Sequence, residues 1–235
     1  MTNPDTAKNI VPTHLGLILD GNRRWARAEG LPTLEGHKRG YANLKAIARA
    51  ASERGVKYVS AYVFSTENWN RSQEEVAYLM KLLLWVAKHE VKQLHKDNVR
   101  VVFLGSKDRL SASIIEAMAK AEAMTAQNTG GTLALCLNYG GHQEIADACK
   151  QIAETGIRAE GITPERIQKH LYGPDLPPID LIIRTSGEQR LSGFMLWSAS
   201  YAELLFVDKP WPAFNADDLD AALAEYASRQ RRFGK

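Results

Sequence analysis

Six short apolar runs, separated by longer stretches of helical periodicity, constrain the fold of this chain more than any other feature. The runs are 15–19, 57–64, 99–104, 132–138, 180–184 and 203–207. The helical stretches are 36–54, 73–96, 109–127, 142–155, 164–171 and 216–231. Strands that alternate with helices favour parallel pairing, right-handed crossovers and helices on the sheet faces. The sequence therefore predicts an α/β fold with a central, mostly parallel six-stranded sheet flanked by helices.

The length of 235 residues suits one large domain, and no linker or repeat interrupts the alternation. We therefore expect a single domain over residues 1–235, with 1–12 as a flexible N-terminal tail. Hydrophobic residues at 45% and charged residues at 24% are typical of globular proteins. The net charge of +3 is too small to indicate a nucleic-acid partner.

Two features of the sequence predict a cytoplasmic location. The first ten residues are polar and lack the apolar core of a signal peptide. The longest apolar stretch, 82–87, is far too short to cross a bilayer.

The centre of the predicted helix 73–96 is apolar nearly all round, from Leu79 to Ala87. Such a helix must bury several faces rather than one stripe. Two interpretations remain open: a helix enclosed by the core, or one wall of a hydrophobic tunnel between the sheet and the helices.

The first apolar run ends in Asp20-Gly21-Asn22-Arg23-Arg24-Trp25. In open α/β sheets, ligands bind beyond the carboxyl ends of the strands. A carboxylate such as Asp20 can ligate Mg²⁺, and the forked guanidinium groups of Arg23 and Arg24 match phosphate oxygens. Gly21 lets the backbone approach a ligand closely. A solvated surface turn is the alternative if this segment stands alone.

Other predicted strand ends add similar chemistry. Three more arginines follow strands, Arg71, Arg184 and Arg190, with hydroxyls at Ser65, Ser186 and Ser192. Five arginines are enough for two strongly anionic groups, although any one of them could form a surface ion pair. His37 could donate to a phosphate oxygen, and Glu203 could join Asp20 in holding Mg²⁺; a purely structural role is the alternative for each.

Two nucleotide-binding patterns are absent: there is no G-x-x-x-x-G-K-[ST] segment, and no G-x-G-x-x-G follows the first strand. The acidic group Asp217-Asp218-Leu219-Asp220 opens a predicted helix, where negative charge suits the helix dipole. We interpret it as a helix cap and not as a metal site.

Taken together and in order, these segments resemble the motifs of the cis-prenyltransferases, the undecaprenyl diphosphate synthase family. The resemblance covers His14 to Gly234. Its motifs are 20–25, 36–38, 64–71, 138–141, 180–192 and 201–204.

The resemblance implies condensation of isopentenyl diphosphate with an allylic diphosphate such as farnesyl diphosphate, forming cis double bonds. It assigns catalytic roles to Asp20 and Asn68, and Mg²⁺ to Asp20 and Glu203. It implies substrate-binding roles for Gly21, Asn22, Arg23, Arg24, Trp25, His37, Ser65, Thr66, Glu67, Trp69, Arg71, Arg184, Arg190, Leu191 and Ser192. The family often makes the residue at Asn68 the proton acceptor. A carboxamide is a very poor base, so we hypothesise that Asn68 orients substrate while a diphosphate oxygen takes the proton.

The C-terminal Arg231-Arg232-Phe233-Gly234 resembles the R-x-G tail that reaches the partner's site in family dimers, which implies a homodimer. The lipid product implies transient contact with the membrane surface. Two departures from the family are Thr33, where arginine is usual, and Gly193, where asparagine is frequent.

Product length stays open. Val63 stands at a tunnel position that is often alanine, which would shorten the product, whereas Gly131 replaces a bulkier residue at the tunnel end, which would lengthen it. We expect a C55 product, the undecaprenyl diphosphate used in bacterial cell-wall synthesis. The alternatives are a short-chain Z-farnesyl diphosphate synthase, a non-catalytic prenyltransferase subunit and, more remotely, a phosphatase.

Overall fold

The computed structural model describes residues 10–229. The strands are β1 (His14–Ile18), β2 (Tyr58–Ser65), β3 (Val99–Leu104), β4 (Gly131–Tyr139), β5 (Leu181–Thr185) and β6 (Glu203–Val207). The α-helices are α1 (Asn22–Ala28), α2 (Thr33–Glu53), α3 (Gln73–His89), α4 (Val91–Lys96), α5 (Ala112–Thr125), α6 (Gly141–Glu154), α7 (Pro164–Gln168) and α8 (Ala216–Ser228). Short 3₁₀ turns are η1 (Thr66–Asn70), η2 (Ala159–Gly161) and η3 (Trp211–Ala213).

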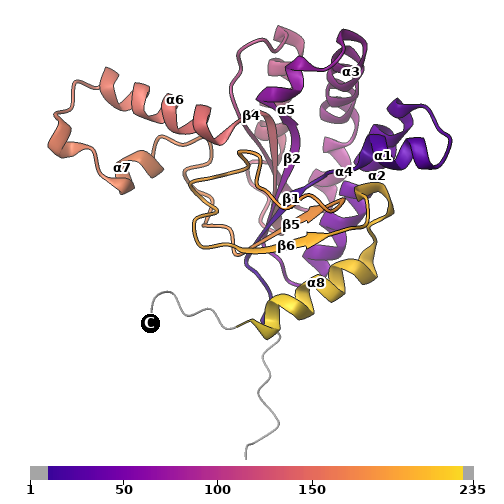
Figure 1. Cartoon of the computed structure of the whole chain (residues 1–235). Helices are drawn as coiled ribbons and strands as arrows, with labels where there is room; N and C mark the ends of the chain where they lie inside the picture. Colours follow the sequence, from indigo (N-terminus) through magenta and orange to yellow (C-terminus); the bar gives the residue numbers. More distant parts are fainter. Residues whose placement is uncertain (1–9, 230–235) are drawn as a thin grey trace, which may run out of the picture.

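The six strands form one sheet in the order β3-β4-β2-β1-β5-β6, and every neighbouring pair is parallel (Figure 1). This confirms the predicted α/β fold, its six strands and their flanking helices. All the carboxyl ends therefore lie along one edge of the sheet. That edge is where the loops with predicted functional residues begin.

Strand β1 explains why its run is apolar without alternation. Leu15 and Leu17 point into the core cluster that also holds Leu44 and Ile47 of α2. Ile18 points into a second cluster, on the other face of the sheet, with Phe194 and other residues from the segment 191–199. Because both faces are covered, each residue of the strand is buried, as expected for a central parallel strand.

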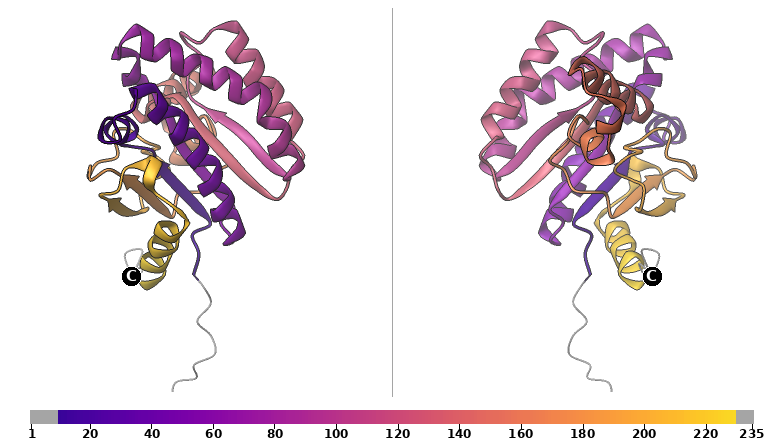
Figure 2. Two further views of the ribbon diagram at one scale, coloured as in Figure 1. Left: turned by 90° about the vertical axis from the view of Figure 1, so that its right-hand side faces the viewer. Right: turned by 90° about the vertical axis from the view of Figure 1, so that its left-hand side faces the viewer.

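The two faces of the sheet are covered differently (Figure 2). Helices α2, α4 and α8 contribute side chains to the cluster on the face of Leu15. A largely irregular segment around 172–202 covers the opposite face. A third cluster, between α3, α5 and the ends of β2 and β4, lies beside the edge where the functional loops begin.

The helix predicted over 73–96 is divided in two at Glu90. Helix α3 ends at His89 and α4 begins at Val91. The Glu90 carboxylate lies 2.6 Å from Lys45 Nζ on α2, which ties α2 to this junction.

The core does not enclose α3 on every side, although one face of the helix packs in the third cluster. Only Glu75, Leu79 and Ala87 are buried along it, and Trp85 is 46% exposed. Its apolar residues Leu82, Leu83 and Val86 instead line a cavity described below.

Most other boundaries agree with prediction to within three residues. Residues 1–9 of the predicted tail lie outside the described residues, and Val11 packs against the core. The acidic group at 217–220 caps α8, since Asn215 and Asp218 form a capping box. Between residues 10 and 229, no helix combines the length and hydropathy required to cross a membrane.

Candidate active site

The loops after β1, β2, β4 and β5 meet at one edge, as predicted. Strands β4, β2, β1 and β5 are consecutive neighbours in the sheet. The register places Ile18 beside Tyr62 on one side and Arg184 on the other. The site is therefore assembled by the topology from segments up to about 170 residues apart in sequence.

Asp20 lies at the centre of this edge. Its Oδ1 accepts a hydrogen bond from the Gly21 amide at 2.7 Å, and its Oδ2 accepts one from Arg184 Nη2 at 3.0 Å. Arg24 Nη2 lies 3.4 Å from Oδ1. The carboxylate is thus held between two guanidinium groups.

Gly21 is required by its surroundings. Its φ is +96°, and a Cβ there would lie 2.5 Å from Ser186 Oγ. Only glycine adopts this conformation without strain or a clash. The loop after β1 can therefore pack directly on the loop after β5.

Helices α1 and α2 approach closely where Gly36 and Gly40 face Asn22. A Cβ at Gly36 would lie 2.1 Å from the Asn22 carbonyl oxygen, and one at Gly40 would lie 2.2 Å from Asn22 Oδ1. Asn22 Oδ1 is buried and has no hydrogen-bond partner among the described residues. The close packing fixes the start of α1, from which Arg23 and Arg24 extend.

The Glu75 carboxylate on α3 contacts three of the predicted site residues, although the sequence analysis did not identify Glu75. Its Oε1 lies 3.0 Å from His37 Nε2 and 2.9 Å from Arg71 Nη1, while its Oε2 lies 3.3 Å from Arg23 Nη1. Burial opposes ionisation of Glu75, but Arg71, His37 and Arg23 together outweigh it and lower its pKa. The pKa of His37 is also lowered, first by burial. The only sequence signal was the i,i+4 spacing of Arg71 and Glu75.

The loop after β5 is organised by Arg184, whose side chain is only 4% exposed. Its Nη1 donates to Ser192 Oγ at 2.8 Å and also to the Arg190 carbonyl, while its Nε has no partner among the described residues. Arg190 itself is exposed and pairs with Glu188 at 2.5 Å. Glu188 also lies 3.2 Å from Arg24, so this carboxylate links the loop after β5 to the segment after β1. Glu188 was not identified in the sequence analysis either.

The η1 turn carries Asn68. Its Oδ1 accepts a hydrogen bond from the Ser65 amide at 3.1 Å, and Ser65 in turn caps the turn through the Asn68 amide. The carboxamide oxygen is therefore engaged within the turn. Trp69 packs in the cluster of Phe64 and Leu137.

Two cavities are relevant to the site, and the first lies at this edge. The first, about 470 Å³, is polar at one end and apolar at the other. Its polar lining includes Asp20, Gly21, Asn22, Arg23, Arg24, Arg27, His37, Asn68, Arg71, Glu188 and Arg190. The apolar end is lined by Val63 and by Leu79, Leu82 and Leu83 of α3.

The second cavity, about 670 Å³, lies between α2, α3, α4 and the amino ends of the strands. It reaches Val99 and Gly131 at its far end. Four side chains, those of Tyr41, Leu44, Val86 and Leu135, line both cavities. The two spaces are therefore neighbours, in series from the arginines toward Gly131.

Several predicted residues lie outside the lining of the first cavity. They are Trp25, Ser65, Thr66, Glu67, Trp69, Arg184, Leu191, Ser192 and Glu203. Of these, Arg184 and Ser192 still reach the site through Asp20, and Leu191 packs on the core. Gly193 has φ +78° and its carbonyl accepts from the Gly141 amide at 2.8 Å, so glycine suits this position.

The two carboxylates predicted to share Mg²⁺ do not lie together in this chain. Glu203 begins β6, where the register places it beside Leu181 rather than beside Arg184. The three residues from Glu203 to Phe206, the neighbour of Arg184, span about 10 Å, and Asp20 lies beyond that level. Glu203 instead pairs with Arg229 at 2.9 Å.

The donor set at the edge fits a Mg²⁺ that arrives with a diphosphate. In the described part of the chain no three His, Cys, Asp or Glu side chains cluster as metal ligands. Mg²⁺ commonly uses one or two carboxylates, and substrate phosphates with water complete its shell. Asp20 supplies such a single carboxylate, beside arginines suited to the phosphates.

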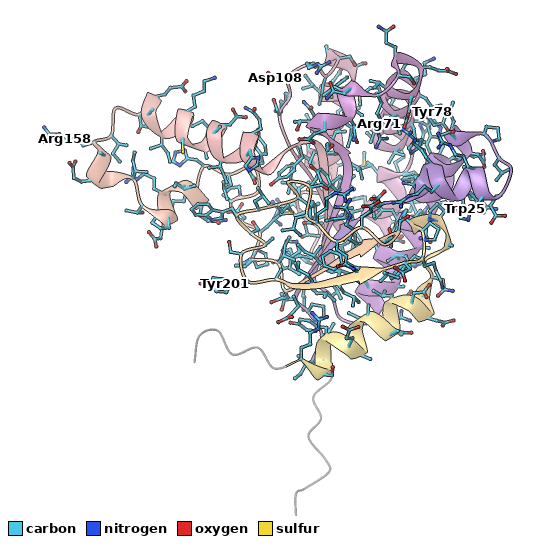
Figure 3. The ribbon with its side chains drawn as sticks, viewed as in Figure 1. Trp25, Arg71, Tyr78, Asp108, Arg158 and Tyr201 are labelled. Atoms are coloured by element: carbon cyan, nitrogen blue, oxygen red, sulfur yellow. The ribbon has the colours of Figure 1, made fainter. Side chains whose placement is uncertain are left out.

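Figure 3 shows where four of the labelled side chains lie relative to the site. Arg71, Trp25 and Tyr78 lie near α1 and α3, on the side of the site. Arg158 lies at the tip of the arm formed by α6, η2 and α7, far from them.

Comparison with known proteins agrees with this arrangement. A family model described as putative undecaprenyl diphosphate synthase matches residues 18–234. The decaprenyl diphosphate synthase of Mycobacterium leprae is 48% identical over 95% of this chain and 77% of its own length. A Thermobifida fusca protein named trans,polycis-polyprenyl diphosphate synthase ((2Z,6E)-farnesyl diphosphate specific) is 44% identical over 98% of this chain and 83% of its own.

A solved structure extends the similarity to three dimensions. Lavandulyl diphosphate synthase from Lavandula x intermedia, in complex with dimethylallyl diphosphate, superposes with a TM-score of 0.91 at 36% identity, covering 96% of this chain and 99% of that one. The family match spans the first cavity and every strand end that lines it. The chain therefore belongs to the cis-prenyltransferase family and is an enzyme of that class.

Proposed function

We propose that this enzyme condenses isopentenyl diphosphate with an allylic diphosphate, with farnesyl diphosphate as the allylic substrate, in a Mg²⁺-dependent reaction. The observation that carries the proposal is the first cavity, which joins an arginine-rich end to an apolar end lined by α3. A diphosphate with a prenyl tail has the same division of chemistry. The solved relative with bound dimethylallyl diphosphate supports an allylic diphosphate as the substrate class.

In this proposal the allylic diphosphate binds to Gly21, Asn22, Arg23 and Arg24, with His37 beside it. Arg184, Arg190 and Ser192 hold the diphosphate of isopentenyl diphosphate. Asp20 lies between the two groups of arginines and would hold Mg²⁺. An ion held there would supply positive charge against the charge that develops on the departing allylic diphosphate. The guanidinium groups act in the same way and are already in position before the reaction begins.

Asn68 orients isopentenyl diphosphate through its diphosphate group, and a diphosphate oxygen accepts the proton. Since Asn68 Oδ1 already accepts from the Ser65 amide, the carboxamide NH₂ is the group left to donate toward substrate. A donor can position a diphosphate but cannot remove a proton.

The product grows from the first cavity into the second. Val63 lines the first cavity and Gly131 the second, so a growing chain meets Val63 before it reaches Gly131. The two cavities are neighbours that share four lining side chains, and a long product, undecaprenyl diphosphate, is proposed to extend from the first into the second. A Z-farnesyl diphosphate synthase, whose product would stay within the first cavity, is the second candidate.

The enzyme is proposed to be a cytoplasmic homodimer that contacts the membrane surface when it releases its product. The projecting arm of α6, η2 and α7 supports dimerisation, since a segment that leaves the body of one chain is suited to pack on another (Figure 1). The family tail, Arg231 to Gly234, lies outside the described residues. For membrane contact, α3 and α4 expose Lys81, Trp85, Lys88 and Lys92 along the outer side of the cavity wall.

The decisive experiment offers labelled isopentenyl diphosphate with dimethylallyl, geranyl or farnesyl diphosphate, with and without Mg²⁺, and resolves products by length. A Mg²⁺-dependent ladder that ends near C55 from farnesyl diphosphate supports the proposal. A product that stops at C15 from geranyl diphosphate supports the second candidate. No incorporation by folded protein overturns both and favours a non-catalytic subunit, whereas phosphate release without a second substrate indicates a phosphatase.

A further inference from the structure

Asn138, the penultimate residue of β4, has features that the reaction described above leaves unexplained. It is 3% exposed, yet it is polar, and its φ of +49° lies in the left-handed region. Asparagine tolerates this conformation better than most residues. A buried polar residue with an unusual backbone requires a reason, and its side-chain contacts provide one.

The Asn138 carboxamide uses all its principal hydrogen-bonding groups to join three segments. Its Oδ1 accepts from the Trp69 indole Nε1 at 2.7 Å. Its Nδ2 donates to the carbonyls of Ser106 and Asp108 at 2.9 and 2.8 Å. One side chain therefore connects the end of β4, the loop after β3 and the η1 turn.

Three contacts restrain the Trp69 ring. Besides the bond to Asn138, its ring packs edge-on against Phe64 with centroids 5.1 Å apart. The Arg109 guanidinium lies 4.4 Å from the ring centroid, in a cation–π contact. Arg109 also has a positive φ, 63°, and belongs to the same loop that Asn138 anchors.

Trp69 is the residue next to Asn68, which lines the first cavity, whereas Trp69 itself lines neither cavity. Elsewhere in the turn, Glu67 and Asn70 are exposed. The anchored indole is thus a strong tertiary attachment of the turn that carries Asn68. We propose that Asn138 is a positioning residue, which fixes Asn68 against the substrate by clamping the indole of Trp69.

The expected loss of kcat rests on the proposed function. The contact between Asn138 and Trp69 can be tested without any enzymatic reaction. Asn138→Gly keeps the left-handed backbone accessible and removes the clamp. Trp69→Phe keeps an aromatic ring in the cluster and removes the indole N–H together with the fused pyrrole ring. Displacement of a reacting group by about 1 Å can slow a reaction by roughly 10²-fold, so both variants should lose kcat with little change in KM.

A matched control comes from Thr125, which is fully buried. Its Oγ accepts from the Val101 amide at 3.0 Å and donates to the Ala121 carbonyl at 2.9 Å, far from the η1 turn in sequence. Thr125→Val therefore removes buried hydrogen bonds without touching the clamp. It should lower thermal stability and leave kcat unchanged.

Two measurements decide the matter. Steady-state kinetics should show a kcat loss in Asn138→Gly and Trp69→Phe, and no further loss in the double variant, because both changes break the same bond. Hydrogen exchange should show faster exchange over 65–71 in Asn138→Gly but not in Thr125→Val. The proposal is overturned if Asn138→Gly folds with normal kcat and normal exchange, or if the two losses add fully.

If Asn138→Gly does not fold, Trp69→Phe alone decides the matter by the same two readouts. If the wild-type enzyme transfers no prenyl group, the proposed function fails, while the exchange data still support or overturn the clamp.

Discussion

The Arg184 guanidinium lies 3.0 Å from Asp20 Oδ2, so the proposed metal ligand is already paired with a side chain that is only 4% exposed. Removing the carboxylate would leave Arg184 buried without its anion, which is costly to stability. In this proposal Asp20 therefore has two roles, one in folding and one in the reaction, and a test has to separate them.

Asp20→Asn separates them, because the amide keeps the shape and an acceptor for Arg184. Activity should fall by roughly 10²-fold or more, since the variant loses the charge that holds Mg²⁺. The required Mg²⁺ concentration should rise, while the melting temperature changes less than in Asp20→Ala. Normal activity at ordinary Mg²⁺ would contradict the assignment of Asp20 as the metal ligand.

Asn68→Ala should lower kcat by roughly tenfold to a hundredfold, because the carboxamide orients substrate in the transition state. Asn68→Asp offers a sharper comparison. If the residue were the base, a carboxylate would retain or improve turnover; if it is a donor, the carboxylate repels the diphosphate and turnover falls further. An effect of Asn68→Ala on KM alone, with kcat intact, would remove the catalytic role.

Val86→Phe should shorten the product. Val86 lines both cavities, so a larger ring there narrows the passage between them. Product lengths from farnesyl diphosphate would shift toward shorter chains at an unchanged rate of the first addition. Trp85→Phe, which alters an exposed neighbour on the same helix, is the control and should keep the wild-type length. A full-length product from Val86→Phe would show that the chain does not pass this point.

The combined charge reversals Lys81→Glu, Lys88→Glu and Lys92→Glu should weaken binding to anionic vesicles. Each lysine near such a surface contributes about 1 kcal/mol, and Trp85 suits the interfacial region. Co-sedimentation with vesicles of phosphatidylcholine, with or without phosphatidylglycerol, measures the effect. Prenyl transfer in detergent should be unchanged. Equal binding of both proteins to both kinds of vesicle would refute this contact surface.

Stability should fall as the pH drops below about 6.5, with His14 as one cause. His14 is fully buried between Ser60 Oγ and the Pro177 carbonyl, each 2.7 Å from a ring nitrogen. Burial lowers its pKa, against smaller opposite effects of the Pro177 hydrogen bond and of Asp180. The unfolded chain then binds the proton first, so acid favours unfolding by up to about 1.4 kcal/mol per pH unit.

The corresponding test compares denaturant unfolding at pH 7 and 5.5. His14→Gln should show a shallower dependence on pH than the wild type, and the exposed His95→Gln should keep the wild-type dependence. The pKa of His37 is lowered as well, so part of the slope will remain. An unchanged slope in His14→Gln would contradict its burial in the neutral form.

Sequence patterns predicted the strands well because each run is apolar on both faces, as Leu15, Leu17 and Ile18 illustrate. They also predicted that Asp20 and Arg184 lie at one edge of the sheet, because a parallel topology places the carboxyl ends of all the strands there. Glu203 precedes its apolar run instead of following it, so within this chain it begins β6 at the edge of the sheet opposite Asp20.

What the sequence could not supply were partners distant along the chain. Glu75 and His37 are 38 residues apart, and Glu75 and Arg23 are 52 apart, so no local pattern links them. The same holds for Trp69. The family resemblance implied contact with substrate, and no local pattern links its indole to Asn138, 69 residues away, which accepts its N–H hydrogen bond.

The contacts of Glu75 imply that the allylic site carries its own resident anion. Before substrate enters, this carboxylate balances Arg23 of α1 and Arg71 of the segment between η1 and α3, whose like charges would otherwise repel each other. An arriving diphosphate therefore exchanges partners with Glu75 instead of neutralising bare charges. Such an exchange makes the free-energy change smaller both when the diphosphate binds and when it leaves. This suits an enzyme that must release one diphosphate at every addition.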